Sequence, residues 1–529
     1  MTGGRRTRAL AAAIAVPVLI FVTLAAWAFA SPVGSTPDDN FHLASIWCGL
    51  GDRPGICEES GNPETRLVPS PIINAPCYAY HPEASADCWH PEQPGLSEAS
   101  WMNANGLYPP LFYATMSVFV GPDVVASVVT MRLFNAALAV GMLTGLFFAL
   151  PRRARPALVI SALASAVPLG LFIIPSTNPS SWAILASMTI WVALYGAFTT
   201  TGRRQIVLGA IAVLGAVIGA GARADAAAFA VFAVAIAAIL GARRRRPLLV
   251  PLASAALVVI VSIAFFLTSG QSDVVSSGLP NENPPLSLTQ QLANIVGIPI
   301  LWLDAFGGSG LGWLDTAVPA VVTVLGFGAF CGAIFVGIHR VGLRRAIALT
   351  LAFAALWLVP FVLFNQSHAS VGSIVQSRYL LPLMIILVGV ASLAPRILHS
   401  WRGTRMLVAG AALSLAMAVA LHYNIRRYTV GADSNAVDPG RDAEWWWATA
   451  PSPLAIWVIG SLAFAAVFVV LWFVLREVSD QPDIDETVAV PTTDTEASPK
   501  RVAAIRTDAE GTSGIDGPRT DAPDAQTSR

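Results

Sequence analysis

Runs of roughly 20 apolar residues recur along most of this chain, and each is long enough to cross a lipid bilayer as a helix. Inside lipid every backbone N–H and C=O group must be paired within the protein, so spanning segments are helices or closed barrels. The short alternating segments of a membrane barrel are not seen. Only 12% of the residues are charged and 55% are hydrophobic, whereas soluble domains carry about 25% charged residues. The sequence therefore predicts an all-α polytopic membrane protein.

Apolarity alone predicts about twelve transmembrane helices. They cover residues 9–30, 124–150, 157–175, 179–200, 205–221, 226–242, 247–268, 315–338, 346–364, 376–395, 404–422 and 453–475. The first of them ends in "AWAFASP", which resembles a signal-peptide cleavage site. We favour a retained first helix, because it is long and an acidic motif follows it directly; cleavage is the alternative.

Arginine clusters lie between the predicted spans and indicate which side each loop faces. They are Arg5, Arg6 and Arg8; Arg152, Arg153 and Arg155; Arg203 and Arg204; Arg243 to Arg246; Arg344 and Arg345; and Arg396, Arg402 and Arg405. Because cytoplasmic loops are enriched in Lys and Arg, these clusters predict a plasma-membrane protein with both termini in the cytoplasm. The long polar loops at 31–123, 269–314 and 423–452 then all face outside, and the active site is expected there.

Three domains follow from this topology. Residues 1–8 form a short cytoplasmic N-terminus, and residues 9–475 form the membrane domain. Residues 476–529 are rich in Asp, Glu, Thr, Pro and Ser, which predicts a disordered cytoplasmic tail. Within the first outer loop, residues 107–121 are apolar but too short to cross comfortably. They predict a helix lying on the outer leaflet, with Trp101, Tyr108 and Tyr113 near the headgroups.

The first outer loop contains four of the five cysteines: Cys48, Cys57, Cys77 and Cys88. Four cysteines in one extracytoplasmic loop favour two disulfides, and Cys48–Cys57 with Cys77–Cys88 is the most local of the three connectivities. A zinc site with His81 or His90 as additional ligands is the competing interpretation. The cysteine spacings fit no compact CxxC pattern, so we favour the disulfides.

An acid pair, Asp38 and Asp39, follows the first span in "SPVGSTPDDNFHLAS". The plain interpretation is a solvated loop, or the cap of a short helix that begins near Asn40. However, His42 lies four residues after Asp38 and shares its face if this segment is helical. Two carboxylates at the membrane surface would be suited to deprotonating an acceptor hydroxyl or to holding a divalent cation, for which Asp39 is the candidate ligand.

A second polar group, Arg378 with Tyr379, opens the predicted span in "VQSRYLLPL". Such an arginine often extends to the interface, where its charge stays hydrated. The sharper interpretation is a guanidinium that binds a phosphate, since its planar fork matches phosphate oxygens. Arg132, Arg223 and Asp225 are further charges at outer helix ends, and for Arg223 and Asp225 the plain interpretation is that they pair with each other. Asn178, in "PSTNPSSWA", is adequately explained by turn chemistry.

Several short motifs resemble a bacterial multi-pass family known as domain of unknown function 2142. They are "PDDNFHL", "YPPLFY", "MRLFNAAL", "FGGSGLGWLDT" and "QSRYLLPL", and the resemblance runs through about residues 10–475. The family pattern more often has Asp-Glu at Asp38-Asp39 and Gln-Gly-Arg-Tyr at residues 376–379. Neither difference from the family pattern removes a proposed functional group, since this chain keeps two adjacent acids and the arginine.

This family in turn resembles the GT-C class of membrane glycosyltransferases, which includes the protein O-mannosyltransferases. The resemblance implies a GT-C-like fold and transfer of a sugar from a polyprenyl-phosphate carrier to an acceptor on the outer face. It matches Asp38 to the catalytic base and Asp39 to the second acid. Arg378 would bind the phosphate, and Tyr379, Arg132 and His42 are the further candidates for contact with the substrate.

The leading hypothesis is therefore a polyprenyl-phosphate-sugar-dependent glycosyltransferase with a cell-envelope glycan, lipid or protein as acceptor. Its partners would be the lipid-linked donor, that acceptor and the surrounding lipids, with no nucleic acid; a divalent cation is the one cofactor to consider. The alternatives are a transporter or flippase for lipid-linked saccharides, or a non-catalytic scaffold for envelope assembly. A transporter would need ionisable groups near mid-membrane, whereas the charges here crowd at outer helix ends.

Overall fold

The computed structural model describes the chain except residues 1, 244–246, 280–281, 340, 395 and 477–529. The predicted cytoplasmic tail therefore lies outside the described residues apart from Arg476. Within the described part, ten helices are long and apolar enough to cross a membrane. The prediction of a multi-pass helical membrane protein is confirmed.

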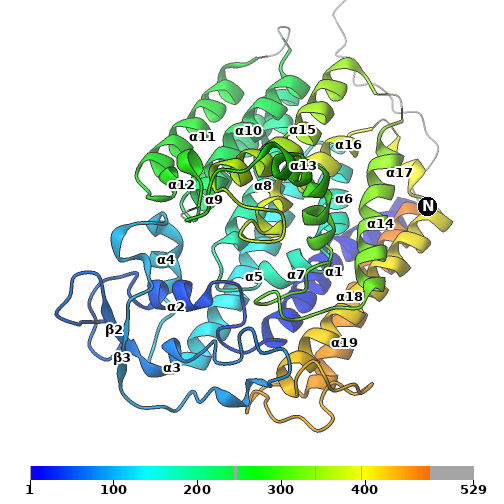
Figure 1. Ribbon diagram of the computed structural model, residues 1–529. Helices are drawn as coiled ribbons and strands as arrows, with labels where there is room; N and C mark the ends of the chain where they lie inside the picture. Colours follow the sequence, from blue (N-terminus) through cyan, green and yellow to red (C-terminus); the bar gives the residue numbers. More distant parts are fainter. Residues whose placement is uncertain (1, 244–246, 280–281, 340, 395, 477–529) are drawn as a thin grey trace, which may run out of the picture. The chain divides into compact units, whose positions relative to one another are not determined.

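Helices make up most of the described chain (Figure 1). The ten span-length helices are α1 (Thr2–Phe29), α5 (Val124–Ala149), α8 (Ser180–Thr199), α9 (Arg203–Ala220), α10 (Ala224–Gly241), α11 (Leu249–Leu267), α14 (Ala320–Gly337), α15 (Leu343–Gln366), α18 (Thr404–Thr429) and α19 (Pro453–Arg476). The shorter α-helices are α2 (Asp39–Trp47), α3 (Ser70–Ile73), α4 (Pro110–Ser117), α6 (Arg155–Ala166), α7 (Leu169–Ile173), α12 (Gln271–Ser277), α13 (Leu288–Asp304), α16 (Leu381–Ala391) and α17 (Ile397–Ser400). Three 3-10 turns are η1 (Ala86–Cys88), η2 (Asn103–Asn105) and η3 (Ser377–Tyr379).

Two of the predicted spans, 157–175 and 376–395, are not single helices of span length. The first is divided into α6 and α7 at Val167 and Pro168, and a proline has no N–H to continue the helical ladder. The second begins as the turn η3 and continues as α16, whose 11 residues rise only about 17 Å. A continuous apolar run in the sequence indicates that a segment is buried in protein or lipid. It does not indicate where a helix within that segment ends.

The α6–α7 segment nevertheless carries the chain back from the end of α5 to the start of α8, a distance comparable to the length of α8. Asn135 of α5 contacts Trp182 near the start of α8, whereas Leu150 at the end of α5 lies against Gly196 near its end. Helices α5 and α8 therefore run in the same direction, and the intervening chain must travel back between them. Helix α16 is buried along its whole length and contacts α6, α8, α14 and α15 (Figure 1).

Outward faces of the helices around this core are apolar, as expected for contact with lipid. The segment 269–314, which was expected to be a loop, contains the helix α13 with the same property. Its exposed side chains include Leu288, Leu292, Val296 and Ile300, and its buried ones include Asn294 and Ile298. An amphipathic helix that is not long enough in apolar residues to span is typical of a membrane surface.

The segment between α1 and α5 forms a small polar layer, drawn in blue at the lower left of Figure 1. It holds the helices α2, α3 and α4 and an antiparallel sheet of β1 (Glu58–Glu59), β2 (Arg66–Pro69) and β3 (Leu96–Ala99), in that order. The short helix predicted within residues 107–121 is present as α4. Its Tyr113, expected near the headgroups, is buried, while Trp101 is exposed.

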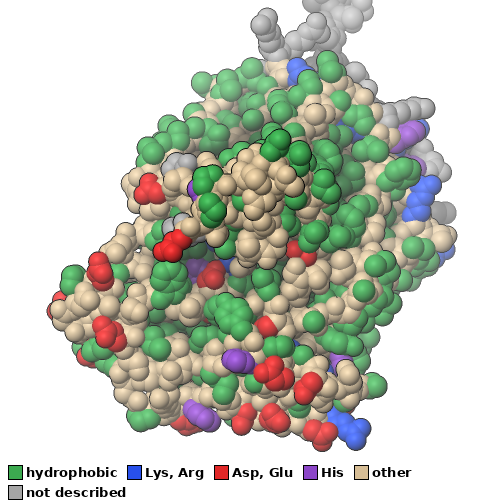
Figure 2. All heavy atoms as spheres, viewed as in Figure 1, with side chains coloured by type: hydrophobic (Ala, Val, Ile, Leu, Met, Phe, Trp, Pro, Cys, Tyr) green, Lys and Arg blue, Asp and Glu red, His purple; other side chains and the backbone are tan. Residues whose placement is uncertain are grey.

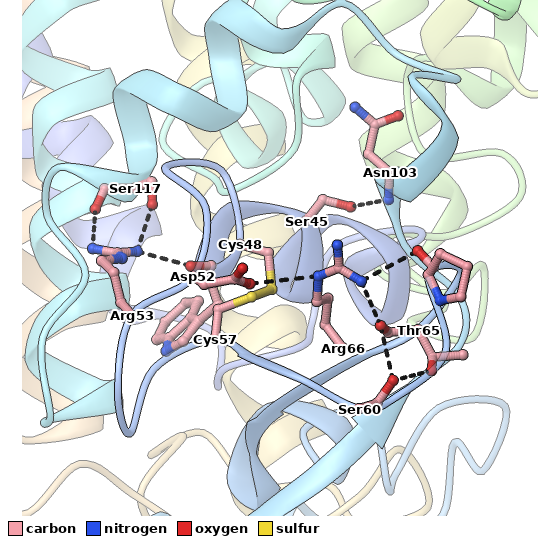
Figure 3. Close-up of a disulfide and its surroundings, with 12 residues drawn as sticks. Ser45, Cys48, Asp52, Arg53, Cys57, Ser60, Thr65, Arg66, Asn103 and Ser117 are labelled. Carbon is pink, nitrogen blue, oxygen red and sulfur yellow. Dashed lines mark hydrogen bonds and ion pairs between the residues drawn. A yellow bond between two sulfur atoms is a disulfide. The ribbon is translucent and has the colours of Figure 1, made fainter.

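Both disulfides have the predicted local pairing, Cys48–Cys57 and Cys77–Cys88. The first joins the last turn of α2 to the following loop (Figure 3). Arg53, inside the closed loop, donates hydrogen bonds to the hydroxyl of Ser117 at 2.7 Å and to the carbonyl of Trp47 at 2.8 Å. The disulfide and this arginine therefore anchor the C-terminal end of α2 against α4.

Replacing Cys48 and Cys57 by serine is expected to lower the free energy of unfolding by about 2.5 kcal/mol, because the closed loop restrains the unfolded chain. The measurement is the unfolding of the purified protein in detergent, with and without reductant. Cys331→Ser is the matched control, since Cys331 is a free cysteine on α14. Equal stability of the double variant and this control would contradict the prediction.

Candidate functional site

The turn between α1 and α2 is buried, although its sequence reads like a solvated loop. Residues 30–37 are all buried, and Asp38 is the first partly exposed residue of the turn. Gly34 has φ of +84° and its α-carbon faces the backbone of Ala75, so a side chain there would collide. The polar residues of this turn are therefore part of the protein interior, and the solvated-loop interpretation is wrong.

Side chains from distant parts of the chain bind the backbone carbonyls of this turn. Arg132 donates to the carbonyls of Ala28, Ser31 and Pro32, Tyr78 to Val33, Trp313 to Gly34, Asn178 to Pro37, and Asn424 to Ala30, at distances of 2.6–3.0 Å. Buried backbone groups need such partners, because leaving them unpaired costs about 1–3 kcal/mol each. The turn is consequently held in one conformation by several helices at once.

Arg132 lies within this supporting network. Its side chain is 2% exposed, and Nη1 and Nη2 donate to three carbonyls and to the hydroxyl of Ser35. Both Nη atoms of this guanidinium therefore donate their hydrogen bonds to oxygen atoms of the protein itself. The structure thus places Arg132 under the acid-bearing turn, where the protein itself uses its Nη donors.

Asp39 also points into the protein. Its carboxylate is fully buried, with Oδ2 accepting the backbone N–H of Thr36 and Oδ1 accepting the hydroxyl of Thr177, both at 3.0 Å. Burial raises the pKa of Asp39 above its ordinary value, although these hydrogen bonds and the charge of Arg132 lower it. Successive residues at a helix start point about 100° apart, so the two acids do not act as a pair.

Asp38 points the other way, toward Arg378. It occupies the N-cap position of α2 in the left-handed region with φ of 60°, and its side chain is 41% exposed. Its Oδ2 lies 2.5 Å from Nη2 of Arg378. Burial alone would raise the pKa of Asp38, but the charge and hydrogen bond of Arg378, with contributions from His42 and Arg223, outweigh it, so the pKa lies below its ordinary value. Asp38 is therefore an ionised, reachable carboxylate at neutral pH.

Arg378 does not extend to a membrane interface, because its side chain is 2% exposed and turned inward at the start of α16. Nη2 binds Asp38 and also donates to the hydroxyl of Tyr379 at 3.2 Å. Its Nε and Nη1 atoms are buried without a hydrogen-bond partner. A guanidinium normally uses these donors, so Arg378 holds two N–H-bearing atoms in the protein interior without an acceptor.

A second arginine, Arg223, lies near the first. It forms the predicted pair with Asp225, with Nε and Nη2 each 2.8 Å from a carboxylate oxygen. The guanidinium lies over the ring of Tyr379 at 5.1 Å and near that of Tyr108 at 5.7 Å. Tyr379 also contacts Arg378, whose guanidinium lies 5.1 Å from its ring centre, so both arginines contact this tyrosine.

His42 lies on the same face of α2 as Asp38, as the spacing predicted. Its backbone N–H bonds to the carbonyl of Asp38 at 2.9 Å, and its Nδ1 lies 2.9 Å from the hydroxyl of Tyr113. Burial lowers the pKa of His42 to about 3, with Asp38 opposing and Arg378 adding to that effect. His42 is therefore a neutral imidazole, and its Nε2 is buried without a partner.

A divalent cation does not fit at Asp39. Both of its oxygens already accept hydrogen bonds, and the carboxylate has no exposed surface. Within the part of the chain that the structure describes, no three His, Cys, Asp or Glu side chains are grouped as metal ligands. This donor set argues against Asp39 as the metal ligand that the acid pair suggested.

On the face drawn in Figure 2, acidic, basic and histidine side chains meet in a recess between the helices around α12 and the segment around α4. Acidic side chains also gather below it, over the polar layer and the loop before α19. The recess lies on the side of the molecule where α2 begins (Figure 1).

Sequence reasoning singled out Asp38, Arg378, Tyr379 and His42, which the structure brings together. It did not assign a site role to Tyr108 and Tyr113, although both lie in the motif "YPPLFY". It also missed Asn178, whose Oδ1 accepts the N–H of Ser180 as turn chemistry predicts, but whose Nδ2 supports the acid-bearing turn. The sequence shows the local hydrogen bond of Asn178 with Ser180, but it cannot show the bond to Pro37, which is 141 residues away.

The family model for predicted membrane proteins designated DUF2142 matches residues 21–387 of the chain. This range includes Asp38, His42, Arg223 and Arg378 and ends before α18, so it is shorter than the motifs alone suggested. No curated protein matches the chain. Because the match covers more than half of the sequence, the chain belongs to the DUF2142 family of predicted membrane proteins.

Proposed function

We propose that this protein is a glycosyltransferase that moves a sugar from a polyprenyl-phosphate carrier to a cell-envelope acceptor at the outer face of the plasma membrane. The observation that carries the proposal is the contact between Asp38 and Arg378, in which Arg378 keeps two buried atoms, Nε and Nη1, without partners. A base and a phosphate-binding cation are thereby adjacent, as a phosphosugar donor requires.

The proposed reaction is a single displacement that inverts the anomeric carbon. Asp38 takes the proton of the acceptor hydroxyl while that oxygen attacks the anomeric carbon. The bond between this carbon and the phosphate oxygen breaks, and its electron pair leaves with the polyprenyl phosphate. Arg378 stabilises the negative charge that develops on that leaving group. The proton then passes from Asp38 to water, which restores the carboxylate.

The Asp38–Arg378 ion pair fits this sequence of events. An anionic donor competes with the Asp38 carboxylate for Arg378, and the free Nε and Nη1 of Arg378 offer it additional bonds. Once Arg378 binds the phosphate, its positive charge is shared between the phosphate and Asp38. The pKa of Asp38 then rises, because the charge of Arg378 is the main factor that lowers it. A higher pKa makes the carboxylate a better base at the moment it is needed.

The direct test is transfer of radiolabelled sugar from synthetic polyprenyl-phosphate donors by the purified protein in lipid vesicles. Product formation is expected, with inverted configuration at the anomeric carbon. A flippase would move the donor across the bilayer without forming product, and a scaffold would do neither. Transport without transfer across a panel of donors and acceptors would overturn the proposal.

Replacing Arg378 by Gln is expected to weaken donor binding by about 10- to 100-fold, because charge-assisted hydrogen bonds contribute about 1.5–3 kcal/mol each. The pKa of Asp38 should also rise toward its ordinary value when the arginine charge is removed. Activity falls as pH drops through the pKa of a base, so the acid limb of the rate profile should move to higher pH.

The control for this variant is Arg441→Gln, which removes an arginine that is 72% exposed. Donor affinity and the pH profile are measured for both variants. An unchanged acid limb in Arg378→Gln, with transfer intact, would show that Arg378 does not set the ionisation of the catalytic base.

A further inference from the structure

His42 is a second polar residue near Asp38, and the proposed reaction does not use its ring atom Nε2. It is buried and unpartnered, like Nε and Nη1 of Arg378, but it belongs to a different element. Unpartnered N–H groups also occur on Trp27 and Trp191, within helices of the membrane core. His42 differs from these tryptophans because it lies one helical turn from Asp38, on the same face of α2.

The hydrogen bond with Tyr113 determines which ring nitrogen of His42 carries the proton. Burial raises the pKa of Tyr113 well above its ordinary value, so this phenol keeps its proton. Among the described residues, His42 Nδ1 is the one hydrogen-bond acceptor the structure gives to that hydroxyl. If Tyr113 donates to Nδ1, the neutral imidazole carries its own proton on Nε2.

Burial keeps the imidazole neutral although Asp38 is nearby. Asp38 is the strongest charged neighbour of His42, ahead of Arg378 and Arg223. The low pKa of His42 also excludes a role in which this imidazole gains and loses a proton near neutral pH. A fixed hydrogen-bond donor is the remaining chemistry for Nε2.

We propose that His42 is a specificity-determining residue that donates a hydrogen bond from Nε2 to a hydroxyl oxygen of the donor sugar, next to the phosphate bound by Arg378. This inference rests on the proposed function. Arg378 recognises what all polyprenyl phosphates share, whereas His42 recognises the sugar that some of them carry. A site built this way discriminates strongly, because a ligand without the hydroxyl leaves a buried donor unpaired.

The test compares the affinity of the full-length protein in nanodiscs for decaprenyl phosphate and for decaprenyl phosphoglucose, phosphomannose and phosphoarabinose. The measured quantity is the preference for the best sugar-bearing lipid over the bare lipid. His42→Phe keeps an aromatic ring without a donor and is expected to reduce this preference about tenfold. His42→Gln places an amide N–H near the position of Nε2 and should retain most of it.

Two further variants separate this role from a structural one. Tyr113→Phe releases Nδ1 from its partner, so the tautomer is no longer fixed and an intermediate loss of preference is expected. His422→Phe, which removes a histidine on α18, is the matched control and should leave the preference unchanged. A merely structural defect would weaken the binding of all four lipids equally.

The possible results assign failure to one proposal or the other. If wild-type protein prefers a sugar-bearing lipid and His42→Phe keeps that preference, the role of His42 is wrong and the proposed function stands. If wild-type protein binds all four lipids equally, the specificity role is likewise overturned. If none of the lipids binds more tightly to wild-type protein than to Arg378→Gln, the proposed function itself fails.

Discussion

Replacement of Asp38 by Asn is expected to lower kcat for sugar transfer by about 10²- to 10⁴-fold, the usual contribution of a general base. The substitution removes the negative charge and keeps the size of the side chain. Asn is also one of the few residues that adopt a positive φ readily, so the left-handed conformation at this position is preserved. The loss of rate should therefore not reflect a loss of fold.

The adjacent carboxylate, Asp39, is not placed to replace Asp38 in this role. Asp39 is fully buried, and its two oxygens are bound by Thr36 and Thr177. Donor binding should be maintained or strengthened in Asp38→Asn, since Arg378 loses its internal competitor for the phosphate. The expected signature is thus a large fall in kcat with an unchanged or lower KM.

The matched control is Asp52→Asn, in the same polar layer, where the carboxylate is 53% exposed and pairs with Arg66 at 3.6 Å. Both variants are compared for abundance in the membrane, unfolding temperature and transfer rate. Transfer by Asp38→Asn within about twofold of the control would remove Asp38 from the mechanism, because general-base catalysis contributes far more than that.

The second large effect is expected at Arg427, whose replacement by Met should lower the free energy of unfolding by about 3–5 kcal/mol. Its Nη2 lies 2.9 Å from Oδ2 of Asp315, and both side chains are almost fully buried. The same guanidinium donates to the carbonyls of Tyr78 and Ala84. Arg427 thus joins α18 to the polar layer between α1 and α5 and to the segment before α14. Removing it leaves a buried carboxylate without its counter-ion.

A double-mutant cycle with Asp315→Asn separates the lost ion pair from lost packing. The double variant should be more stable than Arg427→Met alone, because it contains no unpaired buried charge. Unfolding in mixed detergent, followed by tryptophan fluorescence, provides the free energies. Strictly additive losses in the two single variants would show that the pair contributes nothing beyond its separate members.

The membrane class, most helices and the disulfide pairing were predictable from the sequence because each depends on local composition. A run of apolar residues must pair its own backbone groups in lipid, whichever neighbours it has. Cysteines about ten residues apart in one loop find each other locally, as Cys48 with Cys57 and Cys77 with Cys88 do.

The ends of helices were harder to predict from the sequence. A helix can continue past its apolar residues where its polar side chains have buried hydrogen-bond partners. The span predicted to stop at residue 422 continues to Thr429 as α18. Its last turns carry Asn424 and Arg427, which bind the acid-bearing turn and Asp315. A polar stretch looks like a loop when its partners are hundreds of residues away.

The sequence alone determined that this chain crosses a membrane repeatedly as helices and carries an acid, a histidine and an arginine suited to a polar site. Only the tertiary structure decided which of them meet. It separated Asp38 from its neighbour Asp39 and brought Asp38 to Arg378, 340 residues further along the chain. The physical reason is that side-chain direction and contact depend on how helices pack, whereas apolarity and charge belong to each residue wherever it lies.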